Sequence, residues 1–538
     1  MPLDMLVSGR IATFAGPTGF GWVEAIGIRN GRVAFAGSAV DLETRADPHT
    51  VRLELEPGEI AIPALTDAHA HFLDAALATE HVDLTTAQTL EEGLALLVEA
   101  DRALPEGAWL QGGGWDQRRW GRWPSAADLD AAIPGRRVAV WSFDHHAVWG
   151  SGIAFAEAGI DGRSLDPDGG IIRRNPDASP EGVVLENACI LIMGRVPAPD
   201  EATLARTLQR FGRQMLELGL VGVHDPGNVS PDVELLAFGA YGRLADAGEL
   251  PIRVHASLRP ESLERAIERG LRSGALLGED PGGRARVGWL KLFADGTLGS
   301  RTAALLEPRE GSTDVGVFRQ GPEELARLVA QAADAGIASQ IHAIGDAAVR
   351  AALDALVPSA GTVPLMPRLE HVQLVHPADR NRFAIHGIAA SIQPIHLRED
   401  AESARTDWGA RAETWGYAWR TLADHGATLA FGTDAPVEPV DPWPGIALAV
   451  LRRDPSWGEA AEPFGQHEAL DLDAALRASS LGPAETTREL DRGRLTPGSR
   501  ADLIVLPAAP REPDSPGASF ATVRPRVVVM DGEVVLER

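Results

Sequence analysis

The segment VGWLKLFADG, residues 287–296, has the pattern of a buried strand that ends in a turn. Apolar side chains fill most of its positions, and Asp295-Gly296 closes it. Amphipathic segments such as 204–219 and 322–336 separate further apolar runs of the same kind, which lie at residues 59–71, 220–227, 251–258, 337–346, 367–374, 387–396 and 427–436. Eight strands that alternate with helices predict a (β/α)8 TIM barrel of the α/β class.

The two terminal regions differ from this middle part, because they consist of short strands and turns. Asn30-Gly31 and Asp531-Gly532 lie between alternating apolar and polar residues, which is a strong hairpin signal. We therefore expect residues 1–58 and 486–538 to form one small β-sandwich domain, and residues 59–485 to form the barrel.

A long interval separates the first barrel strand from the second. We interpret residues 76–200 as an insertion that forms a lid or wall over the barrel mouth. It holds six of the 13 tryptophans, at 109, 115, 120, 123, 141 and 149. This aromatic content mildly favours aryl-substituted substrates. Candidates for the substrate pocket are Trp115, Asp116, His146, Gln393 and His396.

Composition limits the classes of partner. The formal net charge of −26 argues against nucleic acid and anionic membranes. The single cysteine rules out an intramolecular disulfide, and we find neither a signal peptide nor a run of about 20 apolar residues that could span a membrane. We expect a cytoplasmic enzyme acting on a small molecule. The sequence leaves the oligomeric state open, and a homo-oligomer is compatible with it.

Residues that bind metals or move protons close several of the predicted strands. His69 and His71 end the first strand and point the same way, because side chains alternate along a strand. His342, His371 and Asp434 end the fifth, sixth and eighth strands. Chemistry in such barrels occurs at the carboxyl ends of the strands, so these residues predict a site for zinc or a similar divalent ion.

Lys291 is the only lysine of the chain, and it lies on the predicted buried strand at 287–296. A buried amine is costly unless it is neutralised or paired. A neutral lysine amine can take up carbon dioxide to form an anionic carbamate, which can bridge two metal ions, whereas arginine stays charged. Lys291 as an ammonium group paired with Asp295 remains the alternative. The number of metal ions, one or two, depends on this choice.

These residues lie in motifs that resemble the amidohydrolase superfamily, in particular the branch of N-substituted formamide deformylase-like enzymes. The motifs are PALTDAHAHF, KLFADGTLGSRTAAL, HAIGDAAV, SIQPIH, DAPVEPVDPWPGI and RGRLTPGSRADLIVL. The resemblance implies a metal-dependent hydrolase with a (β/α)8 barrel and a small β-sandwich formed by both terminal regions. It implies as metal ligands His69, His71, His342, His371 and Asp434, with Lys291 as the bridge. His145 and Ser151 depart from the family pattern, where glycine and asparagine are expected, and this bears on substrate size.

The expected reaction is hydrolysis of a non-peptide carbon–nitrogen bond, of amide or formamide type, by metal-activated water. Asp434 would take a proton from the water and pass it to the leaving nitrogen, as general base and then acid. Asp295 and Asp346 are candidates to hold the second nitrogen of a ligating imidazole. His224 and His255 are more typical of supporting positions.

Three alternatives remain open at this point. A Schiff-base lyase would use Lys291 as a neutral nucleophile. A hydrolase of cyclic amides or a deaminase of the same superfamily would use the same metal site. A non-catalytic binding protein would keep the barrel without the reaction.

Overall fold

The computed structural model describes residues 3–538 apart from 144, 168, 228–234, 459 and 508–518. The chain divides into two compact units. One comprises Met1–Phe72, Gly212–Gly227 and Pro231–Arg538, and the other comprises Leu73–Phe211 and Asn228–Ser230. Among the residues that the structure describes, every helix is too short or too polar to cross a membrane.

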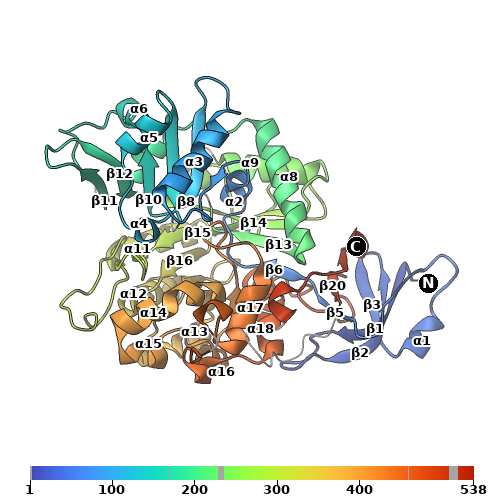
Figure 1. The fold of residues 1–538 in the computed structure, drawn as a ribbon. Helices are drawn as coiled ribbons and strands as arrows, with labels where there is room; N and C mark the ends of the chain where they lie inside the picture. The colour runs from blue at the N-terminus through green and yellow to red at the C-terminus, as the bar shows by residue number, and fades with distance from the viewer. Residues whose placement is uncertain (1–2, 144, 168, 228–234, 459, 508–518) are drawn as a thin grey trace. The chain divides into compact units, whose positions relative to one another are not determined.

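The first unit contains the predicted TIM barrel, which is confirmed (Figure 1). Its parallel strands follow one another in chain order, and each of the eight predicted runs overlaps one of them. They are β6 (Leu65–Asp67), β13 (Leu220–Asp225), β14 (Arg253–Leu258), β15 (Ala285–Phe293), β16 (Ser339–Ala343), β17 (Arg368–His371), β18 (Ala389–Ile392) and β19 (Leu429–Phe431). The last strand meets the first where Ala68 N donates to Phe431 O, at 2.9 Å, and Asp434 N donates to His69 O, at 2.6 Å.

Helices connect the barrel strands or, in the case of the last three, follow the final strand β19. They are α9 (Leu236–Asp246), α10 (Leu263–Glu268), α11 (Pro322–Asp334), α12 (Asp346–Leu356), α13 (Arg382–His386), α14 (Leu397–Trp408), α15 (Ala410–Trp415), α16 (Trp419–Asp424), α17 (Pro442–Leu451), α18 (Leu472–Ala478) and α19 (Leu481–Thr486). Helix α11 shows why such segments are helical. Proline occupies its first turn, where no intrahelical N–H is lost, and Glu323 and Glu324 face the positive end of its dipole. Its buried residues recur at helical spacing, as Leu325, Leu328, Val329 and Ala332.

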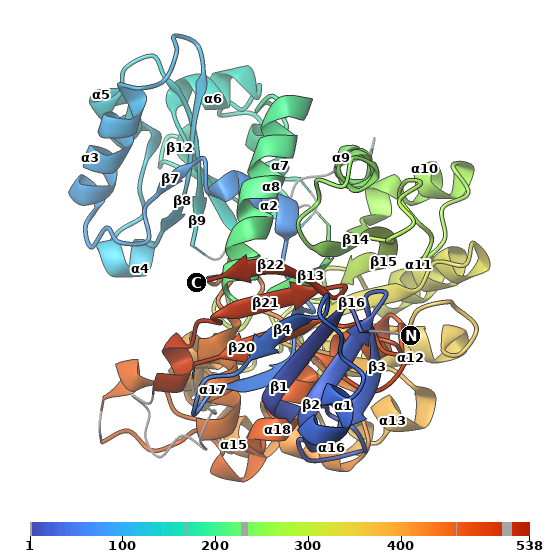
Figure 2. The ribbon, with the colours of Figure 1, turned by 90° about the vertical axis from the view of Figure 1, so that its right-hand side faces the viewer.

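Strands from both terminal regions form one hydrogen-bonded sheet in the first unit, drawn in blue and red in Figure 2. Its order is β22-β21-β20-β5-β1-β2-β3, and β4 also pairs with β1. The strands are β1 (Met5–Ala12), β2 (Trp22–Arg29), β3 (Arg32–Gly37), β4 (Val51–Glu54), β5 (Ile60–Pro63), β20 (Leu503–Leu506), β21 (Val527–Met530) and β22 (Glu533–Glu537), with helix α1 (Ala39–Glu43) after β3. Because β5 pairs with β1 and β20, the sheet extends beyond the boundary predicted at residue 58.

The two predicted hairpins of this sheet have the backbone that their sequences favour. Asn30 and Gly31 have φ values of 51° and 71°, and Asp531 and Gly532 have values of 52° and 79°. Positive φ at both central residues is the requirement of the tight turn whose twist matches that of the flanking strands.

Buried charges join the terminal sheet to the barrel. Arg253, at the start of β14, is 2% exposed and donates to both carboxylate oxygens of Asp502, at 2.9 and 3.1 Å. Its Nη2 also lies 2.6 Å from Asp531. Arginine can satisfy both carboxylates because its donors lie in a fixed planar fork.

The second unit is a separate α/β layer. Its sheet has the order β11-β12-β10-β9-β8-β7. The elements are β7 (Val82–Asp83), β8 (Trp109–Trp115), β9 (Arg137–Ser142), β10 (Ala147–Gly150), β11 (Gly170–Arg174), β12 (Pro180–Glu186), α3 (Leu90–Asp101), α4 (Gln117–Trp120), α5 (Ala126–Ala132), α6 (Gly152–Glu157) and α7 (Cys189–Met193). The chain enters this unit within α2 (Phe72–Ala78) and leaves it within α8 (Glu201–Glu217).

Candidate metal centre

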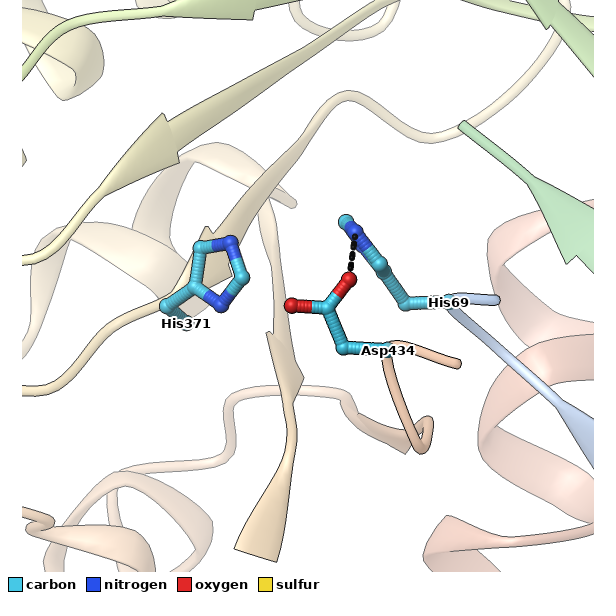
Figure 3. Close-up of side chains that lie close together, drawn as sticks. All are labelled: His69, His371 and Asp434. Carbon is cyan, nitrogen blue, oxygen red and sulfur yellow. Dashed lines mark ion pairs between the residues drawn. The ribbon is translucent and has the colours of Figure 1, made fainter. Parts of the chain in front are cut away.

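Three side chains converge at the carboxyl ends of the barrel strands. His69 follows β6, His371 ends β17 and Asp434 follows β19, and one ligand atom of each lies within 4.8 Å of the others. All three residues are buried. Figure 3 shows the Asp434 carboxylate between the two imidazole rings, with an ion pair to His69. The group therefore combines two nitrogen donors and one oxygen donor, which suits zinc and similar ions.

The ring of His69 is held from behind by a carboxylate. Its Nδ1 donates to Glu370 Oε2 at 2.5 Å, and its Nε2 lies 3.3 Å from Asp434 Oδ1. With its proton on Nδ1, the ring presents the lone pair of Nε2 towards Asp434. An imidazole fixed in this way by a carboxylate is the usual arrangement behind a metal.

His71 is oriented in the same sense by the backbone. Its Nδ1 donates to Gly227 O at 2.6 Å, and its Nε2 lies 3.5 Å from Asp434 Oδ1. His69 and His71 therefore aim the same ring nitrogen at the same carboxylate oxygen, as predicted for H-x-H at a strand end.

His371 and His342 lie against each other, with ring centroids 4.4 Å apart. His371 Nδ1 is buried and forms no hydrogen bond. Burial, followed by the proximity of His342, lowers the pKa of His371 well below its usual range, so the ring is neutral and able to bind a metal. His342 Nε2 donates to Gly296 O at 3.0 Å and lies 3.5 Å from Asp295 Oδ1. This nitrogen thus has its own acceptors, and His342 lies beside the group of three.

The two oxygens of Asp434 face different partners. Oδ1 faces His69 and His71, whereas Oδ2 lies 3.5 Å from Nε2 of His396. Asp434 also has a φ of 63°, an uncommon backbone conformation for a residue with a side chain.

Asp67 holds this strained segment in place. Its carboxylate accepts hydrogen bonds from the backbone N–H groups of His69 and Thr433, at 3.0 and 3.1 Å, and from Thr433 Oγ1 at 2.6 Å. It therefore links the residues after β6 with those after β19, on which His69 and Asp434 lie.

Lys291 lies in the barrel interior, where it is 1% exposed. Burial lowers the pKa of Lys291 to about 8, although the carboxylates of Glu370 and Asp434 act in the opposite direction. Its Nζ lies 4.8 Å from the centroid of the Phe293 ring. On β15, Phe293 is paired in register with His342 on β16. Strand β15, which carries Lys291, therefore lies beside the strand that carries His342.

Glu370 is the residue of this site that the sequence analysis missed. It lies inside the motif PRLEHVQL and is 0% exposed. Of the acceptors expected for the ligands, Asp295 lies beside His342 but accepts mainly from the backbone N–H groups of Ala304, Ile344 and Gly345. Asp346 accepts from Leu306 N. A carboxylate next to a strand-end histidine was the only available signal for Glu370.

The candidates for the substrate pocket fall into both units. His396, at the end of the 3-10 turn Pro394–His396, stacks on His371 with ring centroids 5.7 Å apart. Gln393 precedes that turn, is 3% exposed, and neither of its amide atoms forms a hydrogen bond.

The other three candidates belong to the second unit. Trp115 is fully buried in its hydrophobic core and donates to Val140 O. Asp116 caps α4, and His146 pairs with Glu186 at 2.9 Å. Their contribution to a substrate pocket stays a prediction.

The histidines expected in supporting positions are buried in the barrel. His224 accepts a hydrogen bond from Arg368 at 2.9 Å, and its ring lies 5.2 Å from that of His255. Burial lowers the pKa of His255 to about 4, and His224 shifts in the same direction for the same first cause. Both rings are therefore neutral members of the barrel core.

The residues present fit a divalent metal ion. Nδ1 of His371 is a buried nitrogen without a hydrogen bond, and Nε2 of His69 and His71 both point at Asp434 Oδ1. A buried imidazole nitrogen without a hydrogen bond, such as Nδ1 of His371, is costly in a protein interior unless something binds it. A barrel with such a centre at the carboxyl ends of its strands is an arrangement compatible with a metal-dependent hydrolase.

The comparison with known proteins gives the family. The chain belongs to the amidohydrolase family, whose model matches residues 57–536. It is 30% identical over 516 residues to Protein LONG AFTER FAR-RED 3 of Arabidopsis thaliana, covering 94% of this chain and 87% of that protein. It is 26% identical to the N-substituted formamide deformylase of Arthrobacter pascens, covering 90% of each chain.

A solved structure agrees with this membership. An uncharacterised metal-dependent hydrolase from Pyrococcus horikoshii OT3 superposes with a TM-score of 0.76 at 26% identity, covering 96% of this chain and 99% of that one. The predicted resemblance to the amidohydrolases is confirmed. The predicted class of enzyme, a hydrolase of carbon–nitrogen bonds, is confirmed with it.

Proposed function

We propose that this protein hydrolyses an amide or formamide-type carbon–nitrogen bond of a small molecule, with zinc as its metal. The observation that carries the proposal is that the two carboxylate oxygens of Asp434 face different partners. Oδ1 faces His69 and His71, whereas Oδ2 faces His396. One oxygen can bind the metal while the other remains able to accept a proton.

The residues that would hold the metal are His69, His71, His342, His371 and Asp434. A divalent ion at such a site lowers the pKa of a water ligand from 15.7 towards about 7 and polarises the carbonyl group of a substrate. Glu370 and Gly227 keep the rings of His69 and His71 in the tautomer that presents Nε2.

Asp434 would carry the proton transfers. Its Oδ2 takes a proton from the attacking water while the water oxygen forms a bond to the carbonyl carbon. The same proton then passes to the substrate nitrogen, so that the amine leaves as the carbon–nitrogen bond breaks. Because an unprotonated nitrogen is a poor leaving group, the second transfer matters as much as the first.

Lys291 would supply a bridging carboxylate. Its neutral amine attacks the carbon of carbon dioxide, a nitrogen–carbon bond forms, and one proton leaves to solvent, which gives an anionic carbamate. Three features support this role. Lys291 is the only lysine of the chain, it is buried, and its amine interacts electrostatically with the carboxylates of Glu370 and Asp434.

Removing the metal is the direct test of this function. We expect purified protein to contain zinc at one or two ions per chain, measured by inductively coupled plasma mass spectrometry, and to hydrolyse members of a panel of formamides, linear amides and cyclic amides. Chelation should abolish that hydrolysis, and added zinc should restore it. Metal-free protein that instead forms a borohydride-trapped adduct with a carbonyl substrate would contradict the proposal in favour of a Schiff-base lyase.

Replacing Lys291 tests the bridging role of this residue independently of the other metal ligands. We expect Lys291→Arg to lower the metal content per chain and to reduce hydrolysis by 10-fold or more, because a guanidinium cannot form the carbamate. Metal content and kcat/KM are the measurements. A Lys291→Arg protein with the metal content and activity of the wild type would refute the bridging role of Lys291. The proposed hydrolase activity would not be affected by that result.

A further inference from the structure

Arg368 is a fully buried charged side chain of the barrel interior, close to the candidate metal centre. It opens β17, is 0% exposed, and its guanidinium carbon lies 4.0 Å above the centroid of the Trp289 ring. Its donors reach neighbouring strands: Nε and Nη2 donate to Gln340 Oε1 at 3.0 and 2.6 Å, and Nη1 donates to His224 Nδ1 at 2.9 Å. These contacts leave the guanidinium a single orientation.

Two further contacts of Arg368 lead to His69. Its Nε forms an ion pair with Glu370 Oε1 at 2.8 Å. The other carboxylate oxygen of Glu370 accepts a hydrogen bond from His69 Nδ1 at 2.5 Å. Its Nη2 donates to Ala68 O at 2.9 Å, the carbonyl group directly before His69. One guanidinium thus contacts both the group that orients the imidazole ring and the main chain that carries it.

We propose that Arg368 is a positioning residue for the metal centre, which fixes the backbone and the ring of His69 through Ala68 and Glu370 at the same time. The inference rests on the proposed function, since it assigns His69 to the metal. Arg368 touches neither substrate nor metal in this role.

The chemistry of arginine suits this task. Its donors lie in one plane at fixed angles, so holding Gln340 and His224 determines where the remaining donors point. The ammonium group of lysine is a point charge on a flexible chain and cannot hold Glu370 and Ala68 in a set geometry.

The chain offers a matched control in Arg452. This arginine is also 0% exposed and lies 4.3 Å above a tryptophan ring, that of Trp419. Its hydrogen bonds go to main-chain oxygens of Phe464 and Tyr417. Arg368→Met and Arg452→Met therefore remove the same group from similar surroundings. Only Arg368→Met also removes contacts to groups that hold His69 in place.

The experiment measures the dissociation constant for Zn²⁺ by competition with a chromophoric chelator, at a temperature where each variant is folded. We expect Arg368→Met to bind Zn²⁺ 10- to 100-fold more weakly than the wild type, as is typical when the group behind a ligating histidine is lost. Arg452→Met should stay within 3-fold of the wild type. If Arg368→Met does not fold, Arg368→Lys serves in its place, with an expected loss of at least 10-fold.

The outcomes separate the inference from the function on which it rests. Wild-type affinity in a folded Arg368 variant, or an equal loss in Arg452→Met, would overturn the positioning role and leave the hydrolase intact. A wild type that binds no divalent ion would overturn both. A wild type that binds Zn²⁺ but hydrolyses no amide would overturn the proposed function alone.

Discussion

Replacing Asp434 with asparagine is expected to lower kcat for amide hydrolysis by 10²- to 10⁴-fold, the usual contribution of a positioned general acid–base. Asparagine keeps the shape of the side chain and one oxygen for the metal, but its amide cannot accept the proton that Oδ2 takes. Metal content should therefore fall less than activity. Steady-state kinetics and mass spectrometry on the same preparation provide both numbers.

The control for this variant is Asp379→Asn. Asp379 is also a buried aspartate, 3% exposed, and it pairs with Arg350 and Arg382 at 2.9 and 3.0 Å. Its replacement should reduce stability and leave kcat unchanged. If Asp434→Asn retained more than a tenth of the wild-type kcat, proton transfer by Asp434 would have to be abandoned.

Replacing Glu370 with glutamine is expected to affect both stability and metal binding. The variant leaves the buried guanidinium of Arg368 without its counter-charge, which typically costs about 3–5 kcal/mol. It also removes the carboxylate behind His69, for which a 10- to 100-fold loss of metal affinity is usual. Chemical denaturation of the metal-free protein measures the first effect, and Zn²⁺ competition measures the second.

Glu468→Gln is the matched control. Glu468 is 2% exposed, and its two carboxylate oxygens accept separately from the backbone N–H and the hydroxyl group of Thr421. In the variant, the amide oxygen can accept from the N–H while the amide nitrogen donates to the hydroxyl oxygen. We expect little loss of stability and no change in metal affinity. If Glu370→Gln behaved like this control, the ion pair with Arg368 would not contribute to stability, and the hydrogen bond to His69 would not contribute to metal affinity.

The barrel and most of the centre were predictable from the sequence, because each depends on a local pattern. A parallel strand buried on both faces is a short apolar run, and all eight runs overlap a barrel strand. The histidines at the ends of β16 and β17 follow from the position of each run, since the strands of such a barrel all end on one face.

The residues behind the centre were not predictable in this way. In PRLEHVQL, the charged residues Arg368 and Glu370 alternate with apolar ones, a pattern that is more typical of a strand with one exposed face. Both are fully buried, because their charges pair with each other and their further partners come from other strands. Pairings between strands far apart in the chain leave no signature in a single sequence. Trp115, a candidate for the substrate pocket, and Trp149 are 0% exposed in the core of their own unit, a burial that the aromatic content of this segment does not reveal.

The shared sheet of the two terminal regions has a consequence for how the protein is made. Strand β5 pairs with β1 on one side and with β20 on the other, yet β20 is synthesised more than 400 residues after β5. During synthesis, β5 must therefore keep an unpaired edge while the whole barrel is produced, and such an edge invites pairing with other chains. The sheet is the last part of the first unit that can be completed, so folding of this part depends on contacts of very high sequence separation and should be slow.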